Sequence, residues 1–465
     1  MPDLNRILSA TIPLTLASVA RGAQPLVLAD LARAAATRTN AGRTVFIAAD
    51  DSAMRAITES AAFFAPELEV VEYPAWDCLP FDRASPAMSV SARRLAALQQ
   101  LQQPLGAPQL FVTTINAALQ RTLTPFRIRE SVRLLKVGME IGRESLIALV
   151  QRQGYSRVDT VVDSGEYAVR GSVFDLYPSG LGYGLRLDFF GDEIETMRLF
   201  DPSTQRSIQP VQTHLLLPAS EALLDEDSIK RFRTRYREQF GAHATSDPLY
   251  QAVTDGRRLA GMEHWLPLFE DRLVTLFDHL AEGDLVLLDA AAAKASEERL
   301  SDIADYRQAR TDSAARAGGT TYRPLPETAL YLGKDELDRA LIGWPVHRMS
   351  QFAEPESPRV LDFGFKAPRD FSPERAAGNN IYEAAAKHLS ALGTRGLKPI
   401  VAAYTAGSRA RLASLLGDAG KAAPLFADSW QEALGLAVKG RAVAVVLPLE
   451  QGFTSGEVEV LTEQD

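Results

Sequence analysis

The sequence contains a single cysteine, Cys78, among its 465 residues. One cysteine excludes an internal disulfide, and the six histidines are scattered without the spacing of zinc ligands, so no metal site is expected. No stretch approaches the ~18 uninterrupted apolar residues of a membrane span. A mild apolar run at 11–20 is interrupted by proline and hydroxyl residues, which disfavours a signal peptide. Together these absences favour a cytoplasmic protein with no membrane partner.

Positive charge is also scarce, since acidic residues outnumber basic ones and the net charge is −9. General attraction to nucleic acid is therefore not expected of the whole chain. One local cluster of basic residues could still bind DNA, but such runs are more often a solvated connection between domains. The cluster consists of Arg121, Arg127, Arg129, Arg133 and Lys136.

Recognisable catalytic motifs are absent as well. An intact phosphate-binding loop needs glycines for close backbone approach, a lysine for the β- and γ-phosphates and a Ser or Thr for magnesium, and no such stretch occurs. The G-x-S-x-G, H-E-x-x-H and G-x-G-x-x-G patterns are also missing. No catalytic residue is therefore assigned.

The length predicts about three domains of roughly 150 residues each. The first ~120 residues alternate between helical and strand patterns, which is typical of a parallel sheet. The expected helices cover 26–38, 52–64 with Ser52 as its N-cap, and 89–103, and the expected strands cover 44–49, 68–73 and 110–113.

From about residue 155 to 218 the chain is rich in Val, Tyr, Phe and Gly with period-two alternation, which predicts a small antiparallel β domain. In its clearest strand, alternation places three apolar residues on one face and two charged residues with a phenylalanine on the other. The two faces are Leu185, Leu187, Phe189 and Arg186, Asp188, Phe190, and a turn follows at 191–192. A phenylalanine on a charged face is unusual and draws attention to this side of the sheet.

Beyond the β domain, helical sequence returns at about 225–251, and a buried-type strand at 285–288 ends at Asp289. This pattern indicates that the first domain resumes after an insertion. A helix leads into a polar linker at 297–326, and a final α/β unit follows, with strands at 399–404, 442–447 and 458–461 and a helix opened by Ser408. The predicted ranges are 1–130 and 219–335 for the split α/β domain, 131–218 for the inserted β domain and 340–465 for the last α/β domain. The abrupt end after the last strand suggests a fragment.

Three stretches carry distinctive combinations of residues: 73–83 reads YPAWDCLPFDR, 165–171 reads GEYAVRG and 186–194 reads RLDFFGDEI. Their order and spacing resemble the N-terminal part of the bacterial transcription-repair coupling factor (Mfd) family, which is itself similar to the excinuclease protein UvrB. Supporting pieces lie at 261–263 and 276–278. The resemblance covers the whole chain and implies a degenerate P-loop, helicase-like α/β domain, an inserted antiparallel β domain and a second small α/β domain of unknown role.

The resemblance implies that 15–25 corresponds to the phosphate loop of UvrB. Gln24 then stands where the loop has its lysine, and Pro25 replaces the magnesium-binding hydroxyl. Asp289 matches the magnesium-associated aspartate, and Ala290 replaces the glutamate that positions the attacking water. This vestigial nucleotide site is not expected to work, so no cofactor is expected in this chain. ATP and magnesium belong to the DNA translocase motor of the full-length family proteins, which the resemblance places beyond Asp465.

The resemblance also implies a function for the β domain, which in this family binds the excinuclease protein UvrA and recruits nucleotide excision repair to stalled RNA polymerase. The contact positions fall on Arg170, Arg186 and Phe190. Arginine beside an aromatic residue is typical of interface hot spots, and its planar fork suits a carboxylate on an acidic partner. On the residues alone, a cross-strand Arg–Asp pair with Phe190 packed under a loop remains possible. Further implied partners are the autoinhibitory C-terminal domain, and RNA polymerase and DNA through modules outside this chain.

Two other functions remain open at this point. One is an ATP-dependent repair helicase like UvrB, which the altered phosphate loop disfavours. The other is a nucleotide- or sugar-binding α/β protein. Trp76 and Phe81 could stack on single-stranded nucleic acid, although a packed loop is favoured. The helix start at Ser408 could bind an anion, but it lacks a glycine-rich approach.

Overall fold

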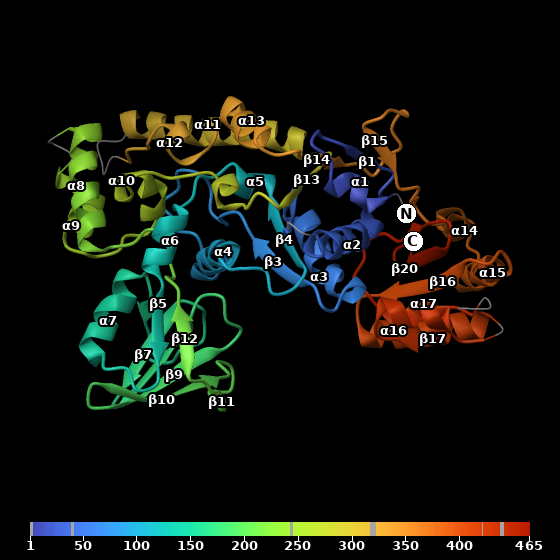
Figure 1. Cartoon of the computed structure of the whole chain (residues 1–465), viewed down its shortest axis with the longest axis horizontal. Helices are drawn as coiled ribbons and strands as arrows, with labels where there is room; N and C mark the ends of the chain where they lie inside the picture. Colours follow the sequence, from blue (N-terminus) through green and yellow to red (C-terminus); the bar gives the residue numbers. More distant parts are fainter. Residues whose placement is uncertain (1–2, 39–40, 242–244, 317–321, 421, 438–440) are drawn as a thin grey trace.

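The computed structural model describes residues 3–38, 41–241, 245–316, 322–420, 422–437 and 441–465. Figure 1 shows a helix-covered α/β body with a β-rich domain below it at one end and a second α/β domain at the other end. None of the described helices is long and apolar enough to cross a membrane.

The main body is built on a seven-stranded parallel sheet with the strand order β15-β1-β14-β13-β2-β4-β3. Its strands are β1 (Thr15–Ala17), β2 (Thr44–Ala48), β3 (Glu69–Tyr73), β4 (Gln109–Thr114), β13 (Leu285–Asp289), β14 (His347–Met349) and β15 (Val360–Asp362). Every residue of β2 and β4 is buried, as expected for a parallel sheet covered on both faces. β13, which follows the insertion in the chain, pairs with β2, so strands from before and after the insertion share one sheet. The predicted range 340–465 contains β14 and β15, and therefore part of this sheet.

Helices of the main body cover both faces of the sheet. Among them, α2 (Gln24–Ala36) carries Pro25 in its first turn, where the missing N–H costs nothing. The others are α1 (Leu4–Leu8), η1 (Arg21–Ala23), α3 (Asp51–Phe64), α4 (Met88–Leu101), α5 (Ile115–Ala118), α6 (Pro125–Ser131), α8 (Glu226–Phe240), α9 (Pro248–Thr254), η3 (Met262–Trp265), α10 (Leu266–Phe269), η4 (Leu276–His279), α11 (Ala292–Arg316), α12 (Glu327–Leu330) and α13 (Lys334–Ile342).

The predicted N-cap Ser52 and the predicted helix start at Ser408 both lie two residues too late. Asp50, not Ser52, caps α3, because its backbone is extended and its carboxylate accepts the N–H of Ala53 at 2.8 Å. In the last domain, Thr405 caps α16 (Ala406–Ala419). Ser408 is its third helical residue, and its N–H donates to the Thr405 hydroxyl while its own hydroxyl oxygen accepts the Thr405 N–H in a capping box. In both loops several polar residues follow the strand, so the backbone decides which one caps.

The inserted domain contains a six-stranded sheet in the order β11-β10-β9-β8-β7-β6 and a two-stranded ribbon of β5 and β12. Its elements are β5 (Arg133–Lys136), α7 (Arg143–Arg152), β6 (Ser156–Arg157), β7 (Glu166–Arg170), β8 (Val173–Leu176), β9 (Gly184–Phe190), β10 (Glu193–Phe200), β11 (Ser207–Pro210) and β12 (Thr213–Leu216). Leu185, Leu187 and Phe189 are buried in a core that α7 covers, which confirms the predicted inner face of β9.

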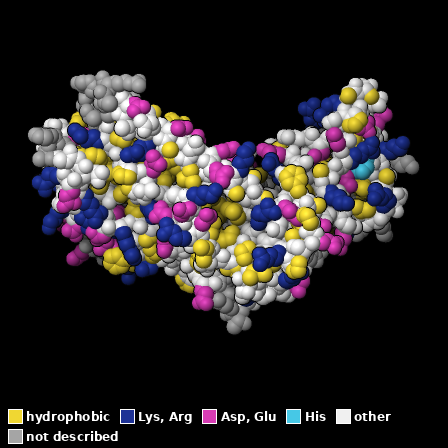
Figure 2. All heavy atoms as spheres, turned by 90° about the horizontal axis from the view of Figure 1, so that it is seen from above, with side chains coloured by type: hydrophobic (Ala, Val, Ile, Leu, Met, Phe, Trp, Pro, Cys, Tyr) yellow, Lys and Arg dark blue, Asp and Glu magenta, His cyan; other side chains and the backbone are white. Residues whose placement is uncertain are grey.

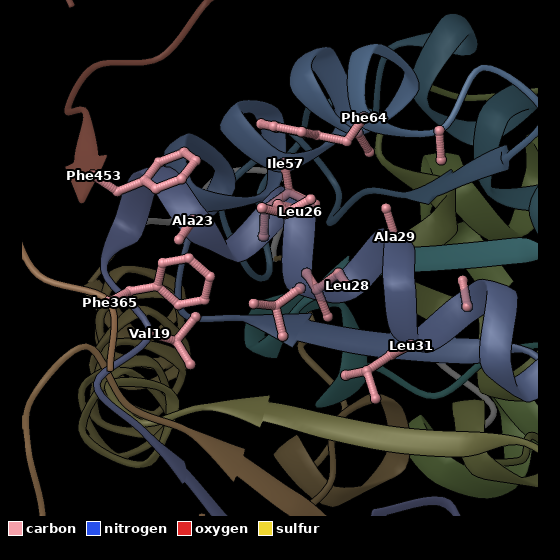
Figure 3. Packing of buried hydrophobic residues seen from close by; sticks show 14 of the residues in the cluster. Val19, Ala23, Leu26, Leu28, Ala29, Leu31, Ile57, Phe64, Phe365 and Phe453 are labelled. Atoms are coloured by element: carbon pink, nitrogen blue, oxygen red, sulfur yellow. The ribbon is translucent and has the colours of Figure 1, made fainter. Parts of the chain in front are cut away.

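The last domain has a five-stranded sheet in the order β17-β18-β16-β20-β19. Its elements are α14 (Ser372–Ala376), α15 (Ile381–Thr394), β16 (Lys398–Ala403), α16, β17 (Leu425–Ala427), α17 (Trp430–Leu436), β18 (Val443–Val446), β19 (Phe453–Thr454) and β20 (Val458–Thr462). One sheet face packs on α15 and α16. Residues from its other face join one continuous hydrophobic core with the main body, where Phe453 lies near Phe365 and Val19 (Figure 3).

A buried ion pair between Arg94 and Glu221 connects the main body to the segment that directly follows the inserted domain. Glu221 follows the last strand of the insertion, and its carboxylate accepts from Arg94 of α4 at 2.6 and 3.4 Å. The indole N–H of Trp76 donates to the same carboxylate at 2.8 Å. Both charged side chains are completely buried, and the guanidinium of Arg94 stacks over the ring of Tyr73 at 4.3 Å. The pair thus joins the two parts of the chain across the insertion.

Candidate functional site

The outer face of the inserted sheet is organised around one buried carboxylate. Asp175 on β8 and Arg186 on β9 are directly opposite each other in the antiparallel ladder. The Nε and Nη2 atoms of Arg186 donate to the two carboxylate oxygens at 2.7 and 2.9 Å, which is the fork geometry of a strong charge-assisted pair. These hydrogen bonds raise the pKa of Arg186, so its charge is fixed at any physiological pH.

A second arginine shares the same carboxylate from the neighbouring strand. Nη2 of Arg170, at the end of β7, lies 3.4 Å from Oδ2 of Asp175. The Asp175 side chain is only 2% exposed, whereas Arg170 is 55% exposed and Arg186 is 20% exposed. The Asp175 carboxylate is therefore buried beneath the two guanidinium groups, which are the parts of this cluster that solvent can reach. Its outward position follows from the alternation of β8, but no motif in the sequence marks it as part of a site.

The ring of Phe200 also contacts the guanidinium of Arg186. The guanidinium lies 4.8 Å from the centroid of the Phe200 ring, within cation–π distance. Phe200 is fully buried in a small outer cluster with Val161 and Ala168. A Cβ on Gly184 would overlap the Phe200 ring, so only glycine fits there. Arg186 is thus held by the carboxylate, by the Phe200 ring and by the Gln205 carbonyl at 3.3 Å.

Phe190 is the exposed end of this face. It is the last residue of β9, next to the turn at Gly191, where φ is +61°. Its side chain is 76% exposed. The sequence left open an arrangement in which an arginine pairs with an aspartate across two strands and Phe190 packs under a loop. The structure contains the cross-strand Arg–Asp pair, but Phe190 is not packed under a loop. The structure thus presents an exposed aromatic side chain on a sheet face that also carries two ordered arginines.

The second candidate site is the degenerate phosphate loop between β1 and α2. Gln24, Pro25 and Asp289 all line one cavity of about 320 Å³, whereas Ala290 lies beside it. With Gln24 at the lysine position, the phosphate-loop pattern puts its two glycines at Ser18 and Ala23. Ser18 still has a left-handed φ of +53°, a backbone shape that suits glycine. The backbone at Ser18 thus has the conformation that the first glycine of such a loop would adopt.

One of the three acidic side chains that line this cavity, Asp289, is hydrogen-bonded to the backbone two residues further along the chain. The Asp289 carboxylate, at the end of β13, accepts the N–H of Ala291 at 2.8 Å. Burial is the main cause that raises the pKa of Asp289. Among the described residues, no group of three or more His, Cys, Asp and Glu could hold a metal ion. Gln24, Pro25 and Ala290 offer neither a cation, nor a magnesium-binding hydroxyl, nor a carboxylate.

Most arginines of the basic cluster at 121–136 form hydrogen bonds or ion pairs with other residues of the chain. Arg121 donates to Glu336 at 2.8 Å, and Arg129 donates to Gln102 at 2.8 Å. Arg127 is 13% exposed and pairs with Glu130, Glu270 and Asp225. On the face shown in Figure 2, Lys and Arg side chains are interspersed with Asp and Glu. A continuous positive surface is therefore absent from that face of the described chain.

The aromatic residues of the 73–83 stretch are packed, as predicted. Trp76 is 6% exposed and Phe81 is 1% exposed, so neither ring offers a stacking surface for nucleic acid. Phe81 adopts a positive φ of +56° to reach its buried position.

Comparison with known proteins places this geometry in a family context. Residues 134–221 match the family described as the UvrB interaction domain. The chain is 36% identical over 283 residues to the transcription-repair-coupling factor of Haemophilus influenzae, covering 60% of this chain and 24% of that protein. It is 32% identical over 339 residues to the corresponding Escherichia coli protein, covering 72% of this chain and 28% of that protein. The chain spans about a quarter of the length of these relatives.

Proposed function

Since this chain belongs to the transcription-repair-coupling factor family, we propose that its inserted β domain binds the excinuclease protein UvrA and thereby recruits nucleotide excision repair to transcription-blocking lesions. The observation that carries the proposal is the exposed Phe190 on the sheet face that also carries Arg170 and Arg186, both paired with Asp175. In this proposal the chain is a recruitment module. Translocation on DNA and contact with RNA polymerase belong to other parts of the full-length family proteins.

The chemistry of the face indicates what its partner must offer. An exposed phenylalanine gains most when it enters an apolar pocket, and ordered guanidinium groups favour carboxylates around that pocket. Arg170 is the more accessible of the two arginines and suits a direct contact with the partner. Arg186 already uses its fork on Asp175, so it contributes positive charge and the edge of its guanidinium. The partner surface should thus be an apolar depression with an acidic rim.

The proposal is tested by measuring the affinity of the chain for UvrA with Phe190→Ala and Arg186→Ala. Each change is expected to weaken binding by about 2 kcal/mol or more, a factor of roughly 30, as for central interface residues. Phe352→Ala is a matched control, because Phe352 is also highly exposed, at 68%, but lies outside the β domain. Unchanged affinity in folded Phe190 and Arg186 variants would reject this surface.

We further propose that the chain hydrolyses no ATP, in contrast to an active helicase like UvrB. The reason is that Gln24 supplies no cation, Pro25 supplies no hydroxyl, and Ala290 cannot position water. Phosphate release is expected to stay at the buffer background with and without DNA. DNA-stimulated hydrolysis that disappears in an Asp289→Ala variant would contradict this, because a contaminating ATPase would not respond to that change.

A further inference from the structure

The cavity beside Gln24 and Pro25 is open and lies between the main body and the last domain. Its walls come from the start of α2, the start of α3, the end of β13 and the segment 449–451 of the last domain. With a volume of about 320 Å³, it is large enough for a small molecule. The charges and hydrogen-bonding groups on its walls therefore decide which kind of molecule it can bind.

Negative charge prevails in this cavity. Three carboxylates but only one guanidinium line it, and they belong to Asp50, Asp289, Glu450 and Arg21. Asp50 and Asp289 each accept one backbone N–H at 2.8 Å, but within the described chain no basic side chain lies at ion-pair distance from any of the three carboxylates. Burial, and to a smaller degree the charge of Asp50, raise the pKa of Asp289, while Arg21 lowers it. A bound cation would relieve this repulsion.

The side chain of Gln24 is a second, independent sign of a ligand. Gln24 lines the cavity and is only 6% exposed. Its side-chain amide forms no hydrogen bond with any residue that the structure describes. Burying an amide without a partner is unfavourable, so a polar group in the cavity is expected to complete it. The amide oxygen of Gln24 can accept a hydrogen bond from such a group.

The two helix starts beside the cavity offer little to an anion. The N–H of Gln24 donates to the Arg21 oxygen, and Pro25 has no N–H. At α3, the N–H of Ala53 already donates to the Asp50 carboxylate. A phosphate would therefore meet few free donors and would be repelled by the three carboxylates.

The arrangement also disfavours a single metal ion. No group of three or more His, Cys, Asp and Glu in the described ranges is close enough to hold one. The three carboxylates thus surround one cavity without converging on one point. Apolar side chains form the rest of the walls, namely Pro25, Ala53, Ala56, Ile57 and Leu449. A flexible molecule with separate ammonium groups joined by methylene groups matches both features.

We propose that this cavity binds a small aliphatic diamine or polyamine. Its ammonium groups pair with the carboxylates and donate to the Gln24 amide oxygen, and its methylene groups lie against Ile57 and Leu449. Since Ile57 belongs to the main body and Leu449 to the last domain, the bound amine contacts both. The site thus takes a cation, whereas a phosphate loop takes an anion.

The proposal is tested with spermidine by isothermal titration calorimetry at low ionic strength. The wild-type chain is expected to bind one spermidine saturably. Glu450→Gln should weaken binding about tenfold, because one charge-assisted contact is lost at an exposed position that the fold tolerates. Gln24→Lys should weaken it at least about a hundredfold, because it places an ammonium group of the chain in the cavity.

A matched control separates this site from general attraction between spermidine and an acidic protein. Glu457→Gln removes the same charge from an exposed glutamate of the last domain that does not line the cavity, and its affinity should equal that of the wild type. Inorganic phosphate should show no saturable binding. Non-saturable uptake of spermidine by the wild type, equal affinity of Glu450→Gln and Glu457→Gln, or saturable binding of phosphate would each overturn the proposal. None of these results depends on whether the β domain binds UvrA.

Discussion

Replacing Glu221 by alanine is expected to lower the free energy of unfolding by about 3–5 kcal/mol, the usual cost of leaving one charge of a buried pair without its partner. Arg94 would remain completely buried, and the Trp76 indole N–H would lose its acceptor. In the wild-type packing bulk water does not reach the guanidinium, so Glu221 is its charged partner. The change is measured by urea unfolding, followed by tryptophan fluorescence and circular dichroism.

An exposed pair on the same helix gives the control. Arg93 on α4 contacts Glu72 at 3.1 Å, but these side chains are 50% and 32% exposed. Glu72→Ala is expected to cost less than about 1 kcal/mol, as for other solvated pairs. A double variant with Arg94→Met and Glu221→Leu should recover most of the loss, because an apolar pair leaves no buried charge. If Glu221→Ala cost no more than Glu72→Ala, the buried pair would not stabilise the root of the insertion.

Strong periodic patterns made part of this fold predictable. The continuous apolar runs that became β2, β4 and β13 indicated a parallel sheet, and the alternation at 185–190 indicated which residues of β9 face the core. The short strands β14 and β15 carry too few residues for a periodic signal, so their place in the large sheet depends on long-range pairing. The contact between the loop at 18–25 and the last domain was hidden for the same reason, since Gly22 and Gln451 lie far apart in the sequence.

The candidate interface was likewise predictable from the sequence only in part. Alternation placed Arg186 and Phe190 on one face, and the structure agrees, but the roles of these two side chains differ. Phe190 is 76% exposed, and alternation alone does not say whether a loop covers the outer face at this point. The bidentate pair depends on the register of β8 against β9, which brings Asp175 opposite Arg186. Strand register is fixed by packing across the sheet and cannot be read from one strand alone.

Asp175→Asn is expected to weaken binding of UvrA about tenfold, although the side chain is almost inaccessible to a partner. This prediction depends on the proposed binding face. The amide keeps the shape but lacks the charge, and only its oxygen can accept, so the fork of Arg186 loses one of its two bonds. Arg170 loses its charged partner as well, and both guanidinium groups gain rotameric freedom that binding must then remove.

Asp188→Asn is the matched control for this positioning role. Asp188 lies on the same face of β9 and its charge also acts on Arg186, but its side chain accepts from the Thr196 hydroxyl at 2.9 Å and forms no hydrogen bond that orients the guanidinium. Its replacement should change the affinity little. If Asp175 acts through Arg186, the double variant Asp175→Asn with Arg186→Ala should bind no more weakly than Arg186→Ala alone, apart from the contribution of Arg170. Full additivity, or wild-type affinity in Asp175→Asn, would mean that the arginines reach their binding positions without the buried carboxylate.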